Sequence, residues 1–376
     1  MTGLPSWTAK LLSLHEAYLF FVYLATAPQV KITGIRIHTL NGPLRDRFGW
    51  SLNWTQSRTE TLIEVTTDAG LTGWGDGRCD SALLNERQDC VIGRSPLEVE
   101  AIFEEMRFPG GPQQRPGAPA APGLDLALWD LVGKIVNRPV SSLLGKRYRN
   151  HVTPYLTAMY RKDWPDLCEG FAEEARGWVD AGYRAMKMKT GFSPEIDIKA
   201  VTAVRKAIGP DIDLGIDSNC AYDAGTAIRL GARLEPLDLT WWEEPLLADD
   251  FEGYRRMRQA LRIPLAAGET GSADWLVLNY IQTGLVDVLQ PDLEHVGLTG
   301  ARMLTQLCWL NRIRLIPHNW GTALRTAATL HWMSTCPPLT PAMNPPMCCL
   351  SSIGPSILFA MRSSLSGSHR KLRVAD

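Results

Sequence analysis

Apolar and polar positions follow two different periods along this chain, and each period marks a separate region. Between residues 31 and 76 apolar residues recur at about every second position, as in residues 61–67, which is the pattern of half-buried strands. The sequence Asp68-Ala69-Gly70 after that run predicts a hairpin turn. Residues 45–57 are polar and aromatic, and we expect a loop there.

Helical spacing follows at residues 81–106 and 124–136, with a Gly/Pro-rich stretch between them, so the strands and helices together predict a small α+β domain. Beyond residue 152 short apolar strands alternate with helix-length segments. Repeated βα units predict a parallel sheet, and a series of this length predicts a (β/α)8 TIM-type barrel. The strands are expected at residues 152–159, 185–189, 212–217, 239–243, 264–267, 286–290 and 314–316, with helices at 165–181, 195–208 and 224–234 among those between them.

Six ionisable residues stand at nearly even intervals in this second region. They are separated by 28, 26, 26, 23 and 26 residues, and one strand-helix unit of such a barrel takes about 30. Active residues of these barrels lie where strands end, so the spacing predicts that the six side chains meet at one mouth. They are Lys189, Asp217, Glu243, Glu269, Asp292 and His318.

The first of the six forms a pair with Lys187, because residues two apart on a strand point the same way. Two amines in one pocket lower each other's pKa, so Lys189 could be neutral near pH 7 and act as a base. A pair of surface lysines on either side of Met188 is the alternative, and for an isolated pair it is the commoner case.

Three carboxylates each close an apolar strand: Asp217, Glu243 and Glu269. Carboxylate oxygens are the ligands that Mg²⁺ prefers, so three at matched spacing predict a magnesium site. A helix cap or a surface charge is the alternative for any one of them. Glu244 cannot point the same way as Glu243 on one strand, and we expect a supporting role for it.

Asp292 and His318 end the next two strands, where they can form a hydrogen bond. A carboxylate that orients an imidazole raises its basicity, so this dyad predicts a general acid or base opposite the lysine. A structural histidine is the alternative.

Composition and charge narrow the class of function. The 376 residues carry a net charge of −1 without a run of Lys and Arg, so we expect no nucleic-acid partner and favour small-molecule chemistry. The eight cysteines show no CxxC pair and no zinc-ligand spacing, which indicates reduced thiols in a cytoplasmic protein.

The first 29 residues contain a short apolar run, residues 17–24, followed by a triplet that resembles a signal-peptide cleavage site. A signal peptide is therefore one interpretation. Against it, His15 and Glu16 break the apolar region, and the run is too short to cross a membrane. We expect residues 1–29 to be a non-native extension before a first strand that starts at Val30, and we expect no membrane partner.

Seven motifs give the chain a family resemblance. Over residues 30–346 it resembles the mandelate racemase subgroup of the enolase superfamily, and within it the galactarolactone cycloisomerases and related acid-sugar dehydratases. The motifs are Ala127-Leu128-Trp129-Asp130 with Gly133-Lys134, Lys187-Met188-Lys189, Asp217-Ser218-Asn219, Glu243-Glu244-Pro245, Gly268-Glu269, Gln290-Pro291-Asp292 and Pro317-His318.

The resemblance implies an α/β fold in which an α+β capping domain, residues 30–150, covers a modified barrel, residues 151–346. It implies Mg²⁺ held by Asp217, Glu243 and Glu269. It also implies Lys189 as one base, Lys187 as its electrostatic partner, and the Asp292–His318 dyad on the other face of the substrate. The implied substrate is a small sugar acid or its lactone, which loses the proton α to its carboxylate. We expect a homo-oligomer.

The fate of the resulting enediolate decides the product, and two outcomes are open. Loss of a β-leaving group gives lactone cycloisomerisation or dehydration, whereas reprotonation on the opposite face gives a racemase or epimerase. A barrel remnant without turnover is a third hypothesis. Substrate contacts are expected from the capping loop and from the region near the metal, at Arg45, Trp50, Asn53, Trp54, Asn219 and Tyr222. Arg45 could instead be solvated, and the tryptophans could be packing between domains.

The chain departs from the family after Pro346. Residues 347–355 match nothing in the relatives, which carry an acidic strand end there as part of the eighth barrel unit. A shifted reading frame of the same codons permits a family-like strand. We therefore expect residues 347–376 to be a frameshifted tail that leaves the barrel without its proper closing strand.

Overall fold

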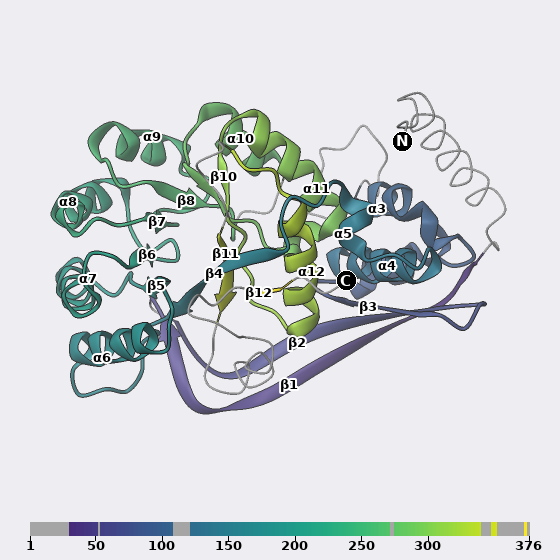
Figure 1. Ribbon diagram of the computed structural model, residues 1–376, viewed down its shortest axis with the longest axis horizontal. Coiled ribbons are helices and arrows are strands. Elements are labelled where there is room, and N and C mark those ends of the chain that lie inside the picture. Colours follow the sequence, from purple (N-terminus) through teal and green to yellow (C-terminus); the bar gives the residue numbers. More distant parts are fainter. Residues whose placement is uncertain are drawn as a thin grey trace, which may run out of the picture.

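The chain folds into two domains, a capping domain and a barrel that lies beside it (Figure 1). The structure is a computed structural model, and it describes residues 30–51, 53–107, 121–270, 274–339, 347–351 and 372–373. The predicted extension of residues 1–29 therefore lies outside the described residues. No helix of the described part is long and apolar enough to cross a lipid bilayer.

The sheet of the capping domain is a long antiparallel hairpin with a third strand beside it. Its strands are β1 (Ile32–Trp50), β2 (Asn53–Thr67) and β3 (Thr72–Asp76). The loop expected at residues 45–57 is wrong, because β1 and β2 stay paired almost to their tip. A register shift between Pro43 and Phe48 makes residues 44–47 bulge. The tip reaches the barrel, where Phe48 is buried and the backbone of Gly49 pairs with that of Arg161. Its burial comes from the other domain and does not alternate along the strand, so the sequence pattern of a strand is absent there.

Helices of the capping domain pack against one face of this sheet. They are α2 (Ser81–Glu86), η1 (Gln88–Cys90), η2 (Pro96–Glu98), α3 (Val99–Arg107), α4 (Pro122–Ile135) and α5 (Val140–Leu144). Helix α4 lies directly on β3, where a Cβ on Gly75 would stand 2.0 Å from the carbonyl oxygen of Gly123. Backbone approaches this close require glycine, and they hold the helix tightly against the sheet.

The barrel consists of parallel strands that follow one another in sequence order. They are β4 (His151–Ala158), β5 (Ala185–Lys189), β6 (Asp213–Asp217), β7 (Trp241–Glu243), β8 (Leu265–Ala267), β9 (Val288–Leu289), β10 (Arg314–Leu315) and β11 (Met347–Ser351), and β11 pairs with β4. The predicted barrel strands are thus confirmed to within a few residues at their ends, and so is the α/β fold with its α+β cap.

Helices cover the outside of this sheet (Figure 1). They are α6 (Leu167–Asp180), α7 (Pro194–Ile208), α8 (Ala224–Leu234), η3 (Glu235–Leu237), α9 (Phe251–Ala260), α10 (Asp274–Thr283), α11 (Leu293–Leu310) and α12 (Ala323–Thr335). Many of them begin at a side chain that accepts a backbone N–H of the first turn, for example Asp166, Ser193 and Asp223.

The altered end of the chain contains two strands within the described residues, and both pair with β4. Residues Met347–Ser351 form β11, which pairs in parallel with residues 153–157 of β4. A short strand, β12 (Leu372–Arg373), pairs antiparallel with the start of β4. Among the described residues β11 pairs with β4 and not with β10, so the expectation that the barrel lacks its proper closing strand stays a prediction. Backbone pairing does not depend on the side chains that the family carries there. The origin of residues 347–376 in a shifted frame stays a prediction.

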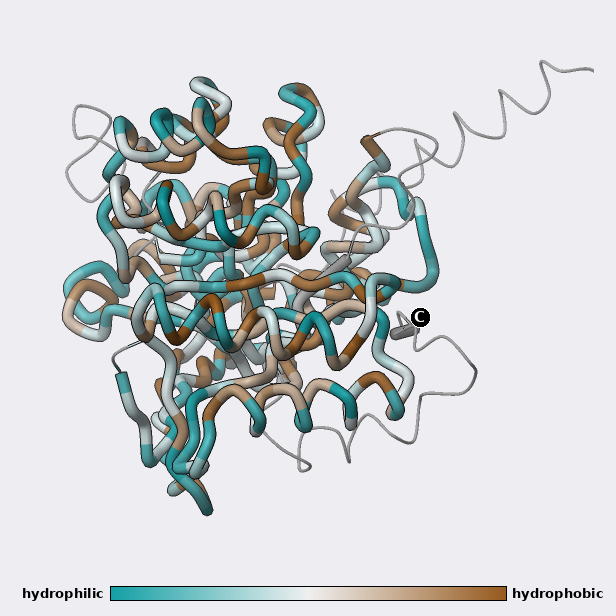
Figure 2. The backbone as a smooth tube through the Cα atoms, turned by 90° about the vertical axis from the view of Figure 1, so that its left-hand side faces the viewer, coloured by the Kyte–Doolittle hydropathy of each residue, from teal (hydrophilic) through white to brown (hydrophobic). Residues whose placement is uncertain are grey.

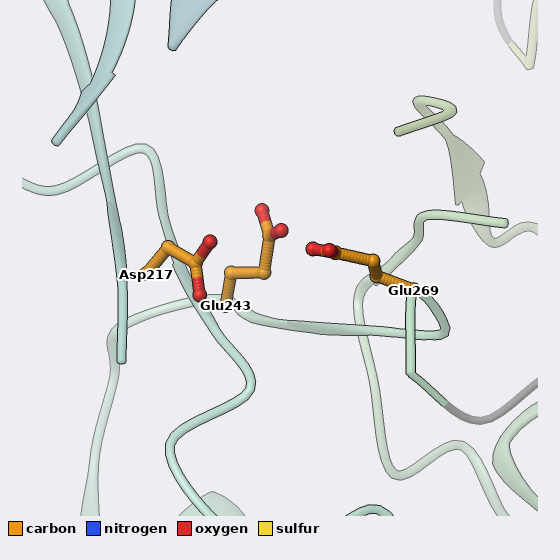
Figure 3. Close-up of side chains that lie close together, drawn as sticks. All are labelled: Asp217, Glu243 and Glu269. Carbon is orange, nitrogen blue, oxygen red and sulfur yellow. The ribbon is translucent and has the colours of Figure 1, made fainter. Parts of the chain in front are cut away.

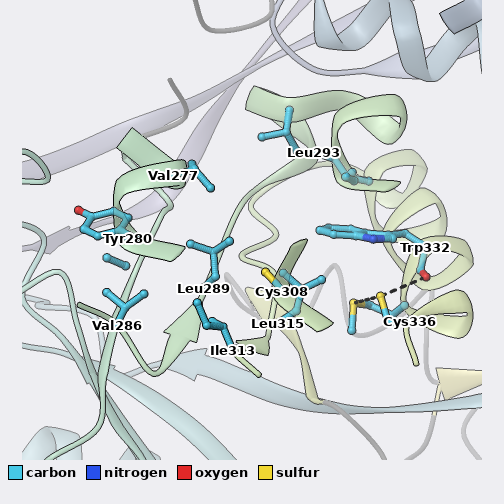
Figure 4. Packing of buried hydrophobic residues seen from close by; sticks show 14 of the residues in the cluster. Val277, Tyr280, Val286, Leu289, Leu293, Cys308, Ile313, Leu315, Trp332 and Cys336 are labelled. Atoms are coloured by element: carbon cyan, nitrogen blue, oxygen red, sulfur yellow. Dashed lines mark hydrogen bonds between the residues drawn. The ribbon is translucent and has the colours of Figure 1, made fainter. Parts of the chain in front are cut away.

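Apolar side chains from both domains form one continuous core. Along the outer helices brown apolar and teal polar positions alternate with each turn, as amphipathic packing requires (Figure 2). Part of this core lies between the last strands of the sheet and helices α11 and α12, where Leu289, Leu315 and Trp332 are buried (Figure 4). The last strands of the sheet are thus supported by a tightly packed apolar layer.

The two domains meet where α4 packs against α11. Asp125 of α4 is 2% exposed, and its carboxylate accepts hydrogen bonds from the backbone N–H (2.9 Å) and the hydroxyl (2.5 Å) of Thr299 in α11. Trp129 of α4 donates to the same hydroxyl at 2.9 Å. Burial raises the pKa of Asp125 to about 6 although the hydrogen bonds from Thr299 oppose that rise. The ionised carboxylate is therefore a destabilising group at this domain contact.

We predict that this aspartate lowers the stability of the fold as the pH rises. Below the unfolded pKa of 3.8 both states hold the proton, and between pH 4 and 6 the unfolded state loses it first. The shift to about 6 corresponds to about 3 kcal/mol at 1.36 kcal/mol per unit. Denaturant unfolding of the wild type and Asp125→Asn from pH 4 to 7 measures this difference. The wild type should lose stability relative to the variant, and parallel pH curves would contradict the prediction.

Candidate active site

The six evenly spaced ionisable residues come together because their strands are neighbours in the sheet, and the first three lie side by side in register. Lys189 is the cross-strand partner of Asp217 on β5 and β6, and Asp217 is the partner of Glu243 on β6 and β7. Glu269 follows two residues after the end of β8, and Asp292 and His318 each follow three residues after β9 and β10. Parallel strands end at the same edge of the sheet, so one mouth collects all of these side chains.

Three carboxylates form a candidate cation site at this mouth. Asp217, Glu243 and Glu269 each offer an oxygen, and these oxygens lie within 4.8 Å of one another (Figure 3). Asp217 and Glu243 are fully buried. The Oε2 atom of Glu269 is also buried, and it has no hydrogen-bond partner among the described residues. A buried carboxylate oxygen without a donor is costly, and a divalent cation would satisfy it.

Two buried lysines compensate the negative charge of this triad. Lys187 Nζ lies 2.5 Å from Glu243 Oε1 and 3.2 Å from Asp217 Oδ2. Lys189 Nζ lies 2.5 Å from the same Oδ2 atom and 3.1 Å from Asn219 Oδ1, to which it donates. Both lysines therefore point into the barrel as predicted, and the surface alternative is wrong.

The environments of the carboxylates move their pKa values apart. Burial raises the pKa of Glu243 to about 8, although Lys187 lowers it. Burial also acts on Asp217, but the positive charges of Lys189 and Lys187 outweigh it and hold the pKa of Asp217 well below its usual range. Burial would raise the pKa of Glu269, but the positive charges of His318 and Lys189 outweigh burial and lower it. Groups whose pKa values are pushed apart in one pocket are typical of functional sites.

Asp292 and His318 form the predicted dyad on the other side of the triad. His318 Nδ1 lies 2.8 Å from Asp292 Oδ2, and His318 Nε2 lies 3.4 Å from Glu269 Oε1. The backbone N–H of Trp320 also donates to Asp292 Oδ2, at 3.1 Å. Asp292 is the N-cap of α11 as well, so it fixes a helix and an imidazole together.

The dyad and Lys189 face a cavity of about 240 Å³. Aromatic rings of Trp50, Tyr160 and Trp320 line part of it and contact one another through Phe48, which lies 6.1, 5.0 and 6.0 Å from them between ring centroids. The full lining consists of Trp50, Arg78, Tyr160, Lys189, Asn219, Glu269, Asp292, Glu294, His295, His318 and Trp320.

Some of these lining residues were missed in the sequence. Tyr160 stands 29 residues before Lys189, about one more interval of the even spacing, but a tyrosine is uncharged near pH 7 and does not stand out at the end of an apolar strand. Glu294 and His295 lie two and three residues after Asp292, so their position close to a predicted site residue was the available signal. Arg78 reaches the cavity from the segment after β3, which no sequence pattern links to the barrel.

The expected substrate contacts divide into two groups. Trp50 and Asn219 line the cavity. Tyr222 is not part of the lining, and its hydroxyl donates to Asp197 instead, behind the cavity wall. Tyr222 lies close to the metal motif in the sequence, but this did not fix the direction of its side chain. The chain turns between them at Asn219 and Cys220, which both have positive φ.

The three remaining residues of the capping hairpin lie outside this cavity. Arg45, Asn53 and Trp54 are exposed. The ring of Trp54 is covered by two guanidinium groups, with the Cζ atoms of Arg47 and Arg161 at 4.5 and 5.1 Å from its centroid. The extended hairpin places these residues on its outer part, outside the cavity lining, and their role as substrate contacts stays a prediction.

Glu244 has the supporting role that its strand position predicted. It is fully buried, faces away from the triad and accepts hydrogen bonds from the backbone N–H groups of Gly268 at 3.4 Å and Thr270 at 2.8 Å. The hydroxyl of Thr270 donates to it too. Glu244 therefore fixes the segment that carries Glu269.

Comparison with known proteins identifies the family. Residues 33–145 match the mandelate racemase / muconate lactonizing enzyme N-terminal domain, and residues 170–346 match the enolase C-terminal domain-like family. The chain belongs to the enolase superfamily, in its mandelate racemase subgroup. The resemblance drawn from the seven sequence motifs is thereby confirmed.

Relatives of this enolase-superfamily chain catalyse related isomerisations. A D-galactarolactone cycloisomerase of Agrobacterium fabrum is 34% identical over 325 residues, 84% of this chain and 85% of that protein. An N-succinyl-L-Arg/Lys racemase of Bacillus cereus is 30% identical over 255 residues, 64% of this chain and 66% of that protein. The crystal structure of a 3,6-anhydro-D-galactonate cycloisomerase of Zobellia galactanivorans superimposes with a TM-score of 0.77 at 30% identity, covering 92% of this chain and 94% of that one. The chain is thus an enolase-superfamily isomerase or lyase.

We predict that the enolase-superfamily triad binds one divalent cation. Titration with Mn²⁺ as the test cation should give one site per chain, and Glu269→Gln should weaken it by more than the roughly 10–100-fold that loss of an outer partner costs. Glu294→Gln is the matched control, because it neutralises another carboxylate of the same cavity outside the triad. Equal loss in both variants, or none in Glu269→Gln, would remove the triad from cation binding.

Proposed function

We propose that the protein is a Mg²⁺-dependent enzyme that removes the proton α to the carboxylate of a sugar acid or its lactone and then expels a β-leaving group. The observation that carries the proposal is the arrangement of two proton-transfer groups around one acidic triad. Lys189 is on β5 and His318 follows β10, and four strands separate these two in the curled sheet. The groups therefore reach the cavity from opposite sides.

The metal site fits the family's ion by the chemistry of its donors. Asp217, Glu243 and Glu269 would hold Mg²⁺ through hard oxygen ligands, and the buried free oxygen of Glu269 provides one of them. When bound, Mg²⁺ acts as a Lewis acid that stabilises the negative charge developing on the substrate carboxylate, an effect worth several kcal/mol.

Lys189 is proposed as the base. Its Nζ lies in the cavity wall, within reach of Asp217 and Asn219, and in its deprotonated form it would accept the α-proton of the substrate. The electrons of the broken C–H bond move into the carboxylate and form an enediolate. Lys187 remains a buried cation beside Asp217 and Glu243. Its charge stabilises the ionised form of these carboxylates and the anionic intermediate.

His318 is proposed as the acid on the opposite side. The enediolate expels the β-oxygen as its C–O bond breaks, and protonated His318 donates from Nε2 to that leaving oxygen. Asp292, hydrogen-bonded at Nδ1, keeps the imidazole in the orientation that points Nε2 into the cavity. The enol product then tautomerises to a 2-keto acid, so no external oxidant or reductant is needed.

A sugar acid suits the cavity by size and polarity. Its walls combine the flat faces of Trp50, Tyr160 and Trp320, on which the C–H side of a sugar can lie, with polar groups for hydroxyls and carboxylates. Two of the similar proteins are named as cycloisomerases of galactarolactone and anhydrogalactonate. The identity of the sugar and the oligomeric state stay open predictions.

A racemase or epimerase is the second candidate, because groups on both faces suffice for it and one relative is named a racemase. Incubation of the enzyme with Mg²⁺ and a panel of sugar acids and lactones in D₂O separates the two. Deuterium in recovered substrate with inverted configuration supports racemisation, and a 2-keto or ring-opened product supports elimination. The hypothesis of an inactive remnant ends if the chain, as its sequence stands, turns over any of these compounds.

We predict that Lys189→Ala and His318→Asn each abolish turnover while Mn²⁺ binding stays within about 10-fold of the wild type, since neither side chain belongs to the triad. General acid–base groups contribute roughly 10²–10⁴-fold, and losses of that size are expected. Lys206→Ala, which changes an amine on the surface helix α7, is the control and should keep full activity. A variant at Lys189 or His318 with wild-type turnover removes that residue from the mechanism.

A further inference from the structure

Arg325, near the start of α12, is a buried charge. It is only 1% exposed, and a guanidinium does not lose its proton in proteins. Such a charge is stable inside a protein only when it is paired. Two of its partners come from the capping sheet: its Nη2 atom lies 2.6 Å from Asp76 Oδ1 at the end of β3 and 3.2 Å from Glu60 Oε2 in β2.

Its other partners belong to the segments that surround the dyad. The Nη1 atom of Arg325 lies 2.6 Å from Glu294 Oε2 and donates to the carbonyl oxygen of Trp320 at 2.9 Å. It also lies 3.5 Å from Asp292 Oδ1. Gly321 leaves room for this approach, because a Cβ there would stand 2.4 Å from Arg325 Nε.

The two oxygens of Asp292 are therefore held from opposite sides. Oδ1 faces Arg325 and accepts the N–H of Glu294 at 2.8 Å, whereas Oδ2 faces His318 Nδ1. We propose that Arg325 is a positioning residue of the reaction, which fixes the Asp292 carboxylate and through it the imidazole of His318. This inference rests on the proposed function, in which that imidazole is the acid.

The charge of Arg325 acts in the same direction as its geometry. Burial alone would raise the pKa of Asp292, but Arg325 and the hydrogen bond with His318 outweigh burial and lower it below its usual range. An ionised Asp292 accepts a hydrogen bond only, so His318 Nδ1 must be the donor and Nε2 is directed toward the cavity.

The capping domain takes part in this positioning through Asp76. Its Oδ1 atom pairs with Arg325, and its Oδ2 atom accepts the backbone N–H of Thr322 at 2.6 Å, at the start of α12. A second arginine, Arg58 on β2 of the capping domain, donates to the carbonyl oxygen of Gly321 at 3.0 Å. The loop between His318 and α12 is thus held by the cap as well as by the barrel.

The test compares Arg325→Lys with the wild type. Lysine keeps the charge but lacks the planar fork, so it cannot reach Asp76, Glu294 and Asp292 together. We expect kcat per Mn²⁺-binding site to fall by about 10–100-fold, with KM changed by less than about 3-fold. Counting sites by Mn²⁺ titration removes any effect of a smaller folded fraction.

A matched control and a double-mutant cycle separate positioning from general stability. Arg205→Lys alters a half-buried arginine that donates to several backbone carbonyl groups away from the cavity, and it should leave kcat within about 3-fold of the wild type. If Arg325 acts through Asp292, Arg325→Lys in an Asp292→Asn background should cost almost nothing more. Full additivity of the two losses, or a loss no larger than that of Arg205→Lys, overturns the proposal.

A structural measurement tests the positioning role without any substrate. Failure to find a substrate would count against the proposed function alone, and the structural comparison would still decide the role of Arg325. Crystal structures of the wild type and Arg325→Lys, grown at one pH with Mg²⁺, give the distance from His318 Nδ1 to Asp292 Oδ2. In the variant we expect this distance to exceed the 3.5 Å limit of a hydrogen bond or the imidazole to adopt more than one orientation. An unchanged dyad in the variant refutes the positioning role. Asp76→Asn provides the same comparison from the cap side if Arg325→Lys does not fold.

Discussion

The mouth of the barrel depends on mutual compensation among charges that have been removed from water. Lys187, Lys189, Asp217 and Glu243 are almost completely buried, and each alone would be far less stable there than in solvent. Together they form a row of ion pairs whose partners are supplied by neighbouring strands in register. Truncating one lysine should therefore leave a buried carboxylate uncompensated, which couples the stability of the strand ends to the integrity of the site.

A second constraint is the close fit between the cap and the barrel. Gly75 and Gly123 let β3 and α4 approach at backbone distance, and Asp125 fastens α4 to Thr299. This packing carries the end of β3, and with it Asp76, to the start of α12. The capping domain is thus more than a cover, because its buried side chains reach the loop that bears the dyad.

The strand ends could be predicted from the sequence because parallel strands connected by helices recur at an even spacing. A polar residue after each apolar run marks the end of each strand. The three carboxylates, both lysines and the dyad were found in this way. The extended hairpin was not, since its tip is buried against the barrel, at Phe48 and Ser51, and has no apolar face that alternates along the strand. Arg325 and Arg78 were not found either, because contacts between segments distant in the sequence leave no local pattern. Tyr222 turned away because a backbone with positive φ at Asn219 reversed the direction of the chain.

The position of β10 explains why the dyad needs support from outside the sheet. The strand pairs with β9 on one side, and within the described part of the chain no pairing joins its other side to β11. A strand of two residues that is paired on one side only, as β10 is within the described residues, gives little rigidity to His318, the proposed acid, which follows it by three residues. Lys189 has no such need, because β5 lies between β4 and β6. The network of Arg325, Asp76 and Asp292 lies beside β10. There it supplies to His318 the rigidity that Lys189 gains from the two strands on either side of β5.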